Sequence, residues 1–381
     1  MRLLILNYEY PPVGAGAGRI AAHLAREWAV LGISVTVVTA GFQENTGESV
    51  EDGVKIIRLP SRRKQLYRSC PREMLSWIRH ATQYCLKMKD EDLPDLVFAH
   101  FAIPGGKVAL KFKQKRNVPY MIMSHYHDIP WLAKKEMFPF HLLTFCSIRK
   151  ICLNASYRFV QSDEMKNNID RFVGKGEIGR NILIPNGFDS SISIGDEIVR
   201  IPDQVLFAAR LVKQKNPFTF LQAAKMVQKQ MPDIRFVVAG DGPLRNAMEV
   251  WVKKEGLTRN FSFTGWVSNA EMATLFASSS LFVSTSLYEG MSMTIMEALA
   301  AGLRVVATPV SNNPKLLESN DVGRLVPICN AEATAEAIIE CLNCGVTDRE
   351  ALAAAVSEYS WPQVAARYVD YFNVLTSSEN V

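Results

Sequence analysis

The sequence alternates short β-rich runs with segments of helical periodicity, and this alternation limits the possible folds most. Typical runs are RLLILN at residues 2–7, SVTVVT at 34–39 and DLVFAH at 95–100, with a helical pattern over about residues 18–31 between the first two. Strands that alternate with helices are typical of βαβ units and a parallel sheet. The sequence therefore predicts an α/β fold.

The same rhythm stops and restarts once, which indicates two domains. After the loop IPNGFDSSISIGDEIVRIP at residues 184–202, new strand-like runs begin with QVLFAA at 204–209. A chain of 381 residues is also long enough for two full-sized cores. We predict two doubly wound, Rossmann-like domains at residues 1–185 and 204–360, joined by a linker at 186–203. A terminal helix at 361–381 is expected to pack back toward the N-terminal domain.

Composition narrows the class of protein. A hydrophobic content of 48% with 21% charged residues is typical of a soluble globular enzyme. The opening run MRLLIL is too short for a signal-peptide core or a membrane span, so a cytoplasmic protein is expected. The seven cysteines are odd in number and mostly scattered, which favours reduced thiols over a disulfide framework or a metal site.

Charge is distributed unevenly along the chain. Residues 1–186 carry a formal charge of +10 and the remainder −5. The densest basic segment, Arg58–Arg79, also contains Leu66, Tyr67, Leu75 and Trp77. Such a segment could lie on an anionic membrane or hold an acidic acceptor, and a solvated helix and loop is an equal alternative. No nucleic-acid partner is expected.

A glycine-rich loop follows the first predicted strand. In YEYPPVGAGAGR, at residues 8–19, neither register completes the G-x-G-x-x-G fingerprint, and no acidic residue follows the second strand. A nicotinamide cofactor is therefore not expected. Gly14 and Gly16 instead precede a helix N-terminus, where open N–H groups favour a phosphate. A tight turn without a ligand is the alternative.

Two further motifs lie in strand-to-helix loops of the second half. Arg210 and Lys215 follow its first strand, where two cations could neutralise a diphosphate. In STSLYEGMSMTIMEALAAG, Glu289 and Gly290 precede a helix predicted from about Ser292 to Ala301. Glu297 follows Glu289 along the same segment, so the two carboxylates do not oppose each other as in a glycoside hydrolase. They suit different parts of one polyhydroxylated ligand, although Glu297 alone could equally be a surface glutamate.

Taken in order, the motifs YEYPPVGAGAGR, PYMIMSHYHDIP, LIPNGFD, AARLVKQKN, VVAGDGPLR, FTGWV and EGMSMTIMEALAAG resemble the retaining glycosyltransferases of family 4, which have the GT-B fold. The resemblance spans nearly the whole chain. It implies two Rossmann-like domains that face each other across a cleft. The sequence departs from the usual family pattern at Tyr126, Ser292, Ser311, Asn312 and Lys315.

The resemblance also implies roles for individual residues. Glu289 would contact donor-sugar hydroxyls, Glu297 the ribose, and Arg210 and Lys215 the diphosphate. His125 would lie at the reacting sugar, with Asp128 close by. The remaining candidate binding residues are Gly14 and Gly16 at the distal phosphate, Val267 at the base, Gly290, Met291 and Ser292 at the diphosphate, and Met293 near the base.

The expected reaction is transfer of a hexose-type sugar from a nucleotide diphosphate sugar to an acceptor hydroxyl, with retention and without a metal or other cofactor. The sequence has no Asp-x-Asp clamp in a suitable loop; DED at residues 90–92 fits a solvated turn. The acceptor is expected to be a sugar or a lipid-linked sugar in polysaccharide or glycolipid synthesis, which fits a location at the inner face of the plasma membrane. Alternatives are a related epimerase or phosphorylase, and a non-catalytic nucleotide-sugar binding protein.

Overall fold

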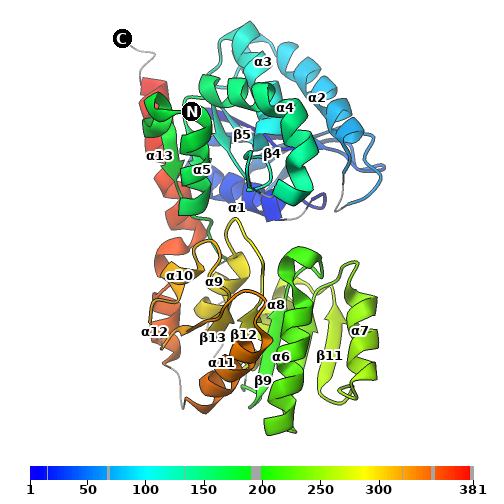
Figure 1. Ribbon diagram of the computed structural model, residues 1–381. Helices are drawn as coiled ribbons and strands as arrows, with labels where there is room; N and C mark the ends of the chain where they lie inside the picture. The colour runs from blue at the N-terminus through cyan, green and yellow to red at the C-terminus, as the bar shows by residue number, and fades with distance from the viewer. Residues whose placement is uncertain are drawn as a thin grey trace. The chain divides into compact units, whose positions relative to one another are not determined.

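The structure is a computed structural model that describes residues 1–14, 16–66, 69–132, 134–189, 199–319, 321–344 and 348–377. The chain divides into two compact units (Figure 1). Unit 1 contains Met1–Asn186 and Trp361–Val381, and unit 2 contains Gly187–Ser360. The C-terminal helix is thus part of unit 1. Residues 190–198 of the predicted linker lie outside the described residues.

Unit 1 is built on an eight-stranded sheet with the order β3-β4-β2-β1-β5-β6-β7-β8. All neighbouring strands are parallel except β3, which is antiparallel to β4. The strand order reverses between β1 and β5. The strands are β1 (Arg2–Leu6), β2 (Ser34–Ala40), β3 (Gly47–Glu51), β4 (Val54–Leu59), β5 (Leu96–His100), β6 (Tyr120–Met123), β7 (Arg158–Val160) and β8 (Asn181–Leu183).

The helices of unit 1 follow from this order, because right-handed crossovers in opposite directions place helices on opposite faces. Helix α1 packs with α13 on one face, while α2, α3, α4 and α5 contact one another in succession on the other. Their bounds are α1 (Gly16–Val30), α2 (Pro71–Leu86), α3 (Lys107–Arg116), α4 (Lys134–Asn154), α5 (Asp163–Val173) and α13 (Trp361–Ser377), with short helical turns η1 (Asp90–Asp92), η2 (Phe101–Gly106) and η3 (Lys175–Arg180).

An aromatic cluster joins α13 to the sheet of unit 1. The ring of Trp28 on α1 lies 5.0 Å from both Phe98 on β5 and Phe372 on α13, measured between centroids. The indole N–H of Trp28 donates to the carbonyl of Ala365 at 3.0 Å. Buried aromatic pairs of this kind add energy beyond their buried area, so α13 completes the core of unit 1.

Unit 2 has a six-stranded parallel sheet with the order β11-β10-β9-β12-β13-β14. Its strand order reverses between β9 and β12. The elements are β9 (Gln204–Ala208), η4 (Lys213–Lys215), α6 (Pro217–Gln230), β10 (Arg235–Ala239), α7 (Arg245–Lys254), β11 (Phe261–Gly265), α8 (Asn269–Ser278), β12 (Leu281–Ser284), α9 (Met293–Ala300), β13 (Arg304–Ala307), α10 (Asn313–Leu316), β14 (Gly323–Leu325), α11 (Ala331–Asn343), α12 (Arg349–Ala354) and η5 (Ser357–Tyr359).

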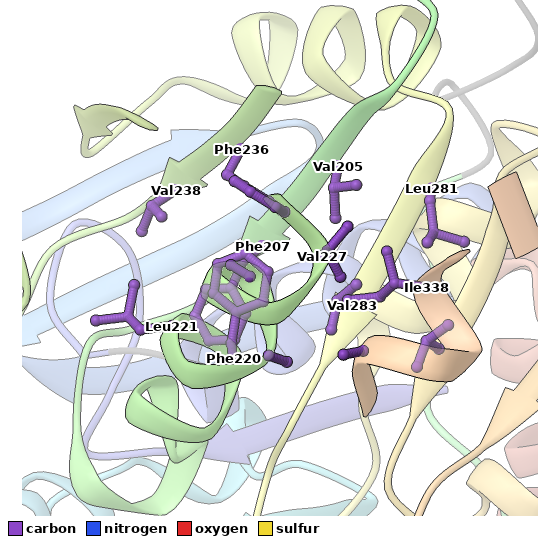
Figure 2. Close-up of a cluster of buried hydrophobic side chains, with 14 of the residues drawn as sticks. Val205, Phe207, Phe220, Leu221, Val227, Phe236, Val238, Leu281, Val283 and Ile338 are labelled. Atoms are coloured by element: carbon purple, nitrogen blue, oxygen red, sulfur yellow. The ribbon is translucent and has the colours of Figure 1, made fainter. Parts of the chain in front are cut away.

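Both faces of the unit 2 sheet are buried. Val205 and Phe207 of β9 join a cluster with α6, α7 and α11, whereas Leu206 and Ala208 join the cluster beneath α8 and α9. Figure 2 shows the first cluster, in which Phe207 stacks on Phe220 with ring centroids 4.8 Å apart. Strands that are covered on both faces have continuous apolar sequences, so these strands could be predicted from the sequence.

The prediction of doubly wound α/β domains is confirmed, and the strands missing from it are short or exposed except for β4, which has six residues and is largely buried. The hairpin strand β3 is mostly exposed, and β8 and β14 have only three residues each. Such strands carry little hydrophobic periodicity. Among the described residues, no helix combines the length and the apolar character needed to cross a bilayer.

The structure corrects the interpretation of Arg58–Arg79 as one surface segment. Trp77 is fully buried and packs edge-on against Tyr8. Arg58 and Arg63 are also buried: Arg58 pairs with Glu51, and Arg63 donates to the carbonyls of Gln65 and Leu66. The exposed residues include Arg62, Lys64, Arg72, Leu75 and Arg79, while Tyr67 and Arg68 lie outside the described residues.

The aromatic cluster predicts that Phe372→Ala destabilises the protein by about 3–5 kcal/mol, because the truncated side chain leaves a cavity against Trp28 and Phe98. Urea unfolding followed by tryptophan fluorescence would measure the loss. Val374→Ala on the same helix, where the side chain is 53% exposed, is the matched control. Equal stability of the two variants would contradict a core role for α13.

Candidate active site

The candidate residues of unit 2 gather where its strand order reverses. β9 and β12 are neighbours, and the chain leaves them in opposite directions toward β10 and β13. In such sheets ligands bind beyond the carboxyl ends of the strands, at this reversal. The loops 209–216 and 285–292 follow these two strands and carry Arg210, Lys215 and Glu289.

The Glu289 carboxylate is the centre of this site. Only 6% of Glu289 is exposed, and its oxygens accept bonds from side chains of both loops. Lys215 forms an ion pair with Oε1, the Ser286 hydroxyl donates to the same oxygen at 2.7 Å, and Gln214 Nε2 donates to Oε2 at 3.4 Å. A buried carboxylate needs such partners to offset its desolvation. The ion pair therefore orients Lys215 toward Glu289.

Backbone contacts hold the same two loops together. The Thr285 hydroxyl donates to the carbonyl of Asn216 at 2.9 Å, and the N–H of Leu287 donates to the carbonyl of Gln214 at 2.8 Å. Gln214 Nε2 also donates to the carbonyl of Tyr288 at 3.0 Å. These bonds fix the position of Lys215 relative to Glu289 before any ligand binds.

Arg210 lies in the same loop, but its side chain is exposed. Two glycines hold the backbone on each side of it. A Cβ on Gly240 would come within 2.1 Å of the Ala209 carbonyl oxygen, and one on Gly242 within 2.5 Å of the Leu211 carbonyl oxygen. Among the described residues, the Arg210 guanidinium has no hydrogen-bond or ion-pair partner, so it is available for an anion.

The segment that leads into α9 has no capping bond from its N-cap side chain and is held by the loop of Ser311 and Asn312. Ser292 precedes the helix without a side-chain capping bond, so no side chain of that residue covers the first-turn N–H groups. The Ser311 hydroxyl donates to the Gly290 carbonyl at 2.5 Å, and Asn312 contacts the sulfur of Met291 at 3.8 Å. Ser311 and Asn312, which depart from the family pattern, thus position the turn of Gly290 and Met291.

The remaining candidates of unit 2 lie on or near α9. Glu297 is on the helix with 7% of its surface exposed, so it is not a solvated surface glutamate. Met293 and Val267 are partly buried and pack on the apolar cluster beneath α8 and α9. By contrast, Arg210, Lys215 and Glu289 lie in the neighbouring loops that follow β9 and β12.

In unit 1 the glycines of the loop before α1 have two different roles. A Cβ on Gly14 would meet Glu9 Cβ at 2.5 Å, and one on Gly18 would meet the Val13 carbonyl oxygen at 3.1 Å, so both permit a tight turn. Gly14 also has a φ of +99°, which favours glycine. Gly16 is different: it is exposed, begins α1, and a Cβ added there would have nothing within 4 Å. Space for a ligand is therefore at Gly16.

Two histidines meet at the ends of neighbouring strands in unit 1. His100 ends β5, His125 follows β6, and His100 Nδ1 lies 2.9 Å from His125 Nε2. Their rings stack with centroids 5.1 Å apart. Burial lowers the pKa of His125 to about 3, and burial together with the neighbouring His125 lowers the pKa of His100 well below its ordinary value. Both rings are therefore neutral at pH 7.

The partners of this pair select its tautomers. His100 Nε2 is buried and has no partner within the described part of the chain. A buried N–H without an acceptor is costly, so the proton of His100 belongs on Nδ1, which donates to His125 Nε2. His125 then carries its own proton on Nδ1. We infer that His100 is a positioning residue for His125.

Asp128 holds the loops after β5 and β6 together. Its Oδ2 accepts the N–H of Ala102 at 2.8 Å and its Oδ1 accepts the N–H of His125 at 2.6 Å. Only 5% of the residue is exposed. Both oxygens are thus used by the backbone. These two bonds place the backbone of His125, and contact of Asp128 with the substrate stays a prediction.

Sequence reasoning missed His100, Gln214, Thr285 and Ser286 as site residues. Thr285 and Ser286 directly follow β12, and His100 ends β5, so all three lie at carboxyl ends of strands that flank a reversal of strand order. Their position after an apolar run was the available signal. Gln214 had no such signal, because its role depends on contacts with the loop after β12.

Comparisons with known proteins match this architecture over nearly the whole chain. The model of glycosyl transferases group 1 matches residues 197–359, and that of Glycosyltransferase Family 4 matches residues 14–192. The structure resembles sucrose-phosphate synthase from Thermosynechococcus elongatus, with a TM-score of 0.83, 19% identity, and coverage of 99% of this chain and 100% of that one.

It also resembles Anabaena HepE in complex with UDP-glucose, with a TM-score of 0.73, 16% identity, and coverage of 98% and 100%. In sequence the chain is 23% identical over 330 residues to alpha-monoglucosyldiacylglycerol synthase of Acholeplasma laidlawii, covering 80% of each protein. Two parallel α/β units with these neighbours define a glycosyltransferase of the GT-B fold. The chain belongs to the group 1 glycosyltransferases of family 4.

The contact of Gly240 with the loop of Arg210 predicts that Gly240→Ala destabilises the protein by more than about 2 kcal/mol, since the new Cβ overlaps a backbone oxygen. Chemical unfolding would measure the change. Gly256→Ala is the matched control: its φ of +73° is also positive, but nothing lies within 4 Å of the added Cβ. A control that loses as much stability as Gly240→Ala would show that backbone strain alone accounts for the loss.

The neutral histidine pair predicts lower stability in acid. Unfolded histidines bind protons near pH 6.5, whereas folded His100 and His125 do not, so acidification from pH 7 to 5 favours the unfolded chain. Asp128, whose pKa burial raises, offsets part of this effect. Each histidine contributes a loss of about 2 kcal/mol over this range, so we expect the pair to lose about 4 kcal/mol before the offset from Asp128, measured by urea unfolding at both pH values. His100→Gln/His125→Gln should reduce this pH dependence, and an unchanged dependence would refute the assignment.

Proposed function

We propose that this glycosyltransferase moves a hexose-type sugar from a nucleotide diphosphate sugar to an acceptor hydroxyl, with retention at the anomeric carbon. The observation that carries the proposal is the Lys215–Glu289 ion pair at the reversal of strand order in unit 2, with the exposed side chain of Arg210 in the same loop as Lys215. Family membership supports retention. The HepE complex with UDP-glucose supports a nucleotide-sugar donor.

On the donor side, the positive charges of Lys215 and Arg210 would balance the diphosphate as it leaves. Lysine has three N–H donors, so Lys215 can hold a phosphate oxygen while it keeps its bond to Glu289. The N–H groups at the start of α9, which the Ser292 side chain does not cap, would add to this stabilisation. Charges placed before reaction lower the barrier because no reorganisation is needed when charge develops. Two cations in these positions support a reaction that needs no metal.

Glu289 has a second role in this proposal, which is to accept hydrogen bonds from donor-sugar hydroxyls. A carboxylate with two oxygens has about four acceptor positions, and the donors Lys215, Ser286 and Gln214 leave room for another. Buried Glu297 would accept from the ribose hydroxyls, and Val267 and Met293 would pack near the base. Gly16 would approach the distal phosphate, because space is open at that position.

On the acceptor side, His125 would orient the acceptor hydroxyl with its Nδ1–H. Because its pKa is about 3, the ring stays neutral through the physiological range. A neutral imidazole of fixed tautomer donates one bond in a set direction. The acceptor is proposed to be a sugar or a lipid-linked sugar in glycolipid or polysaccharide synthesis, and the similarity to a diacylglycerol glycoside synthase supports a lipid-linked one. We also propose a cytoplasmic protein that lies peripherally at the inner face of the plasma membrane.

The rival functions differ in what they release. A transferase releases nucleoside diphosphate in proportion to the acceptor consumed, whereas an epimerase acts without an acceptor, a phosphorylase needs inorganic phosphate, and a binding protein converts nothing. Supplying a panel of nucleotide sugars with and without membrane lipid extract, and measuring nucleoside diphosphate release, would separate them. Release that does not depend on the acceptor would contradict the proposal.

The ion pair predicts that Lys215→Ala lowers the rate of acceptor-dependent nucleoside diphosphate release by at least about a hundredfold, because one preplaced charge at the leaving group is lost. Lys213→Ala is the matched control, since Lys213 is exposed in the same short helical turn. It should retain near-normal activity. Thermal unfolding of both variants checks that they fold, and a folded Lys215→Ala protein with normal turnover would exclude the assigned role.

A further inference from the structure

The outer face of α4 in unit 1 exposes a group of large apolar side chains. Phe138, Leu142 and Leu143 are 61%, 68% and 86% exposed; Phe138 and Leu142 lie one turn apart on the same side of the helix, and Leu143 extends the apolar surface to the adjoining side. Single exposed apolar residues are ordinary, but a contiguous group marks a surface that contacts something apolar. We call these three residues the α4 apolar face.

Basic side chains accompany the α4 apolar face. Arg149 and Lys150 are exposed farther along α4. On the neighbouring helix α3, Lys107, Lys111 and Lys115 are exposed at intervals of four residues and so share one face. Lys107 Nζ donates to the Ser147 hydroxyl at 3.1 Å, which joins the lysine row to α4. Figure 1 shows α3 and α4 in unit 1.

Negative charge is scarce on this surface. The sequence has no Asp or Glu in residues 107–116 or 137–154. The acidic turn Asp90–Asp92 precedes β5, and there Asp90 pairs with Arg116 and Glu91 with Lys89. The positive charge of the lysine row is therefore not balanced by acidic residues of α3 or of residues 137–154 of α4.

We propose that the α4 apolar face and the lysine row of α3 form a docking surface for an anionic lipid bilayer. An interfacial helix inserts Phe and Leu into the boundary of the acyl chains while Lys and Arg bind anionic headgroups. A second copy of the chain fits less well, because two such surfaces would oppose like charges. The proposal rests on the peripheral location proposed above and assigns it to a surface other than Arg58–Arg79.

The docking surface is connected to the acceptor side of unit 1. His141, on the same helix as the α4 apolar face, lies with Nε2 2.9 Å from the backbone carbonyl oxygen of His127. The N–H of His127 in turn donates to the carbonyl of His125. Contact of α4 with a bilayer would therefore bring the histidine loop close to the headgroup layer, where a lipid-linked acceptor presents its hydroxyl.

The test is co-sedimentation of the full chain with phosphatidylcholine vesicles that contain phosphatidylglycerol or none, at low and high salt. We expect binding to the anionic vesicles at low salt that weakens at high salt, since salt screens the lysine charges. Leu142→Ser/Leu143→Ser should reduce the partition coefficient at least about tenfold through lost apolar burial. Lys107→Ala/Lys111→Ala should reduce binding to anionic vesicles only.

The matched control is Val30→Ser/Val250→Ser, which removes two apolar side chains that are 76% and 60% exposed elsewhere and should leave binding unchanged. If the unaltered protein does not bind vesicles, the membrane location is wrong; if it binds and the α4 variant binds equally, only this surface is wrong. Concentration-dependent dimerisation that the α4 variant abolishes, without vesicle binding, would assign the face to a second copy. None of these measurements uses a donor or an acceptor, so they do not depend on the proposed transfer reaction.

Discussion

The buried carboxylate of Glu289 imposes the main constraint on unit 2. An ionised group with 6% exposure costs several kcal/mol unless donors compensate it, and here Lys215, Ser286 and Gln214 do so from two separate loops. Those loops can meet only because β9 and β12 are adjacent. The requirement to satisfy one carboxylate therefore fixes a lysine beside it, and the result is a cation held in place before any ligand arrives.

Unit 1 also holds its loops with buried polar groups, but its histidine pair is uncharged. His100 and His125 stay neutral because burial disfavours their charged forms. Both carboxylate oxygens of Asp128 accept hydrogen bonds from backbone N–H groups. The loops after β5 and β6 are thereby held at fixed positions. The two units thus differ in chemistry: unit 2 holds a cation paired with a carboxylate, and unit 1 holds two neutral imidazoles in fixed positions.

The uneven charge along the chain gains a spatial meaning from the helices of unit 1. Some of its basic residues are structural, since Arg58 and Arg63 are buried and bonded to neighbouring groups. Others, in particular the lysine row of α3, face solvent beside an apolar helix surface. A count of charges cannot separate these two groups, because burial depends on which residues fold over each side chain. The proposed membrane contact follows from the second group.

The sequence by itself determined the fold class, the division into two α/β units and the loops that carry the candidate site. Strands buried on both faces leave continuous apolar runs, and glycines and charged residues directly after such runs mark the carboxyl edge of a parallel sheet. These are local signals. They were sufficient to select Arg210, Lys215 and Glu289 as candidates, whereas His125 was selected through the family resemblance.

Only the tertiary structure decided which of these side chains meet. The pairing of Lys215 with Glu289 and of His100 with His125 depends on strand order, which joins segments far apart in the sequence. The same holds for Trp77, which looked like a surface aromatic but is buried against Tyr8, and for α4, whose apolar residues remain exposed. Burial is a property of the neighbours that folding supplies, so no local pattern contains it.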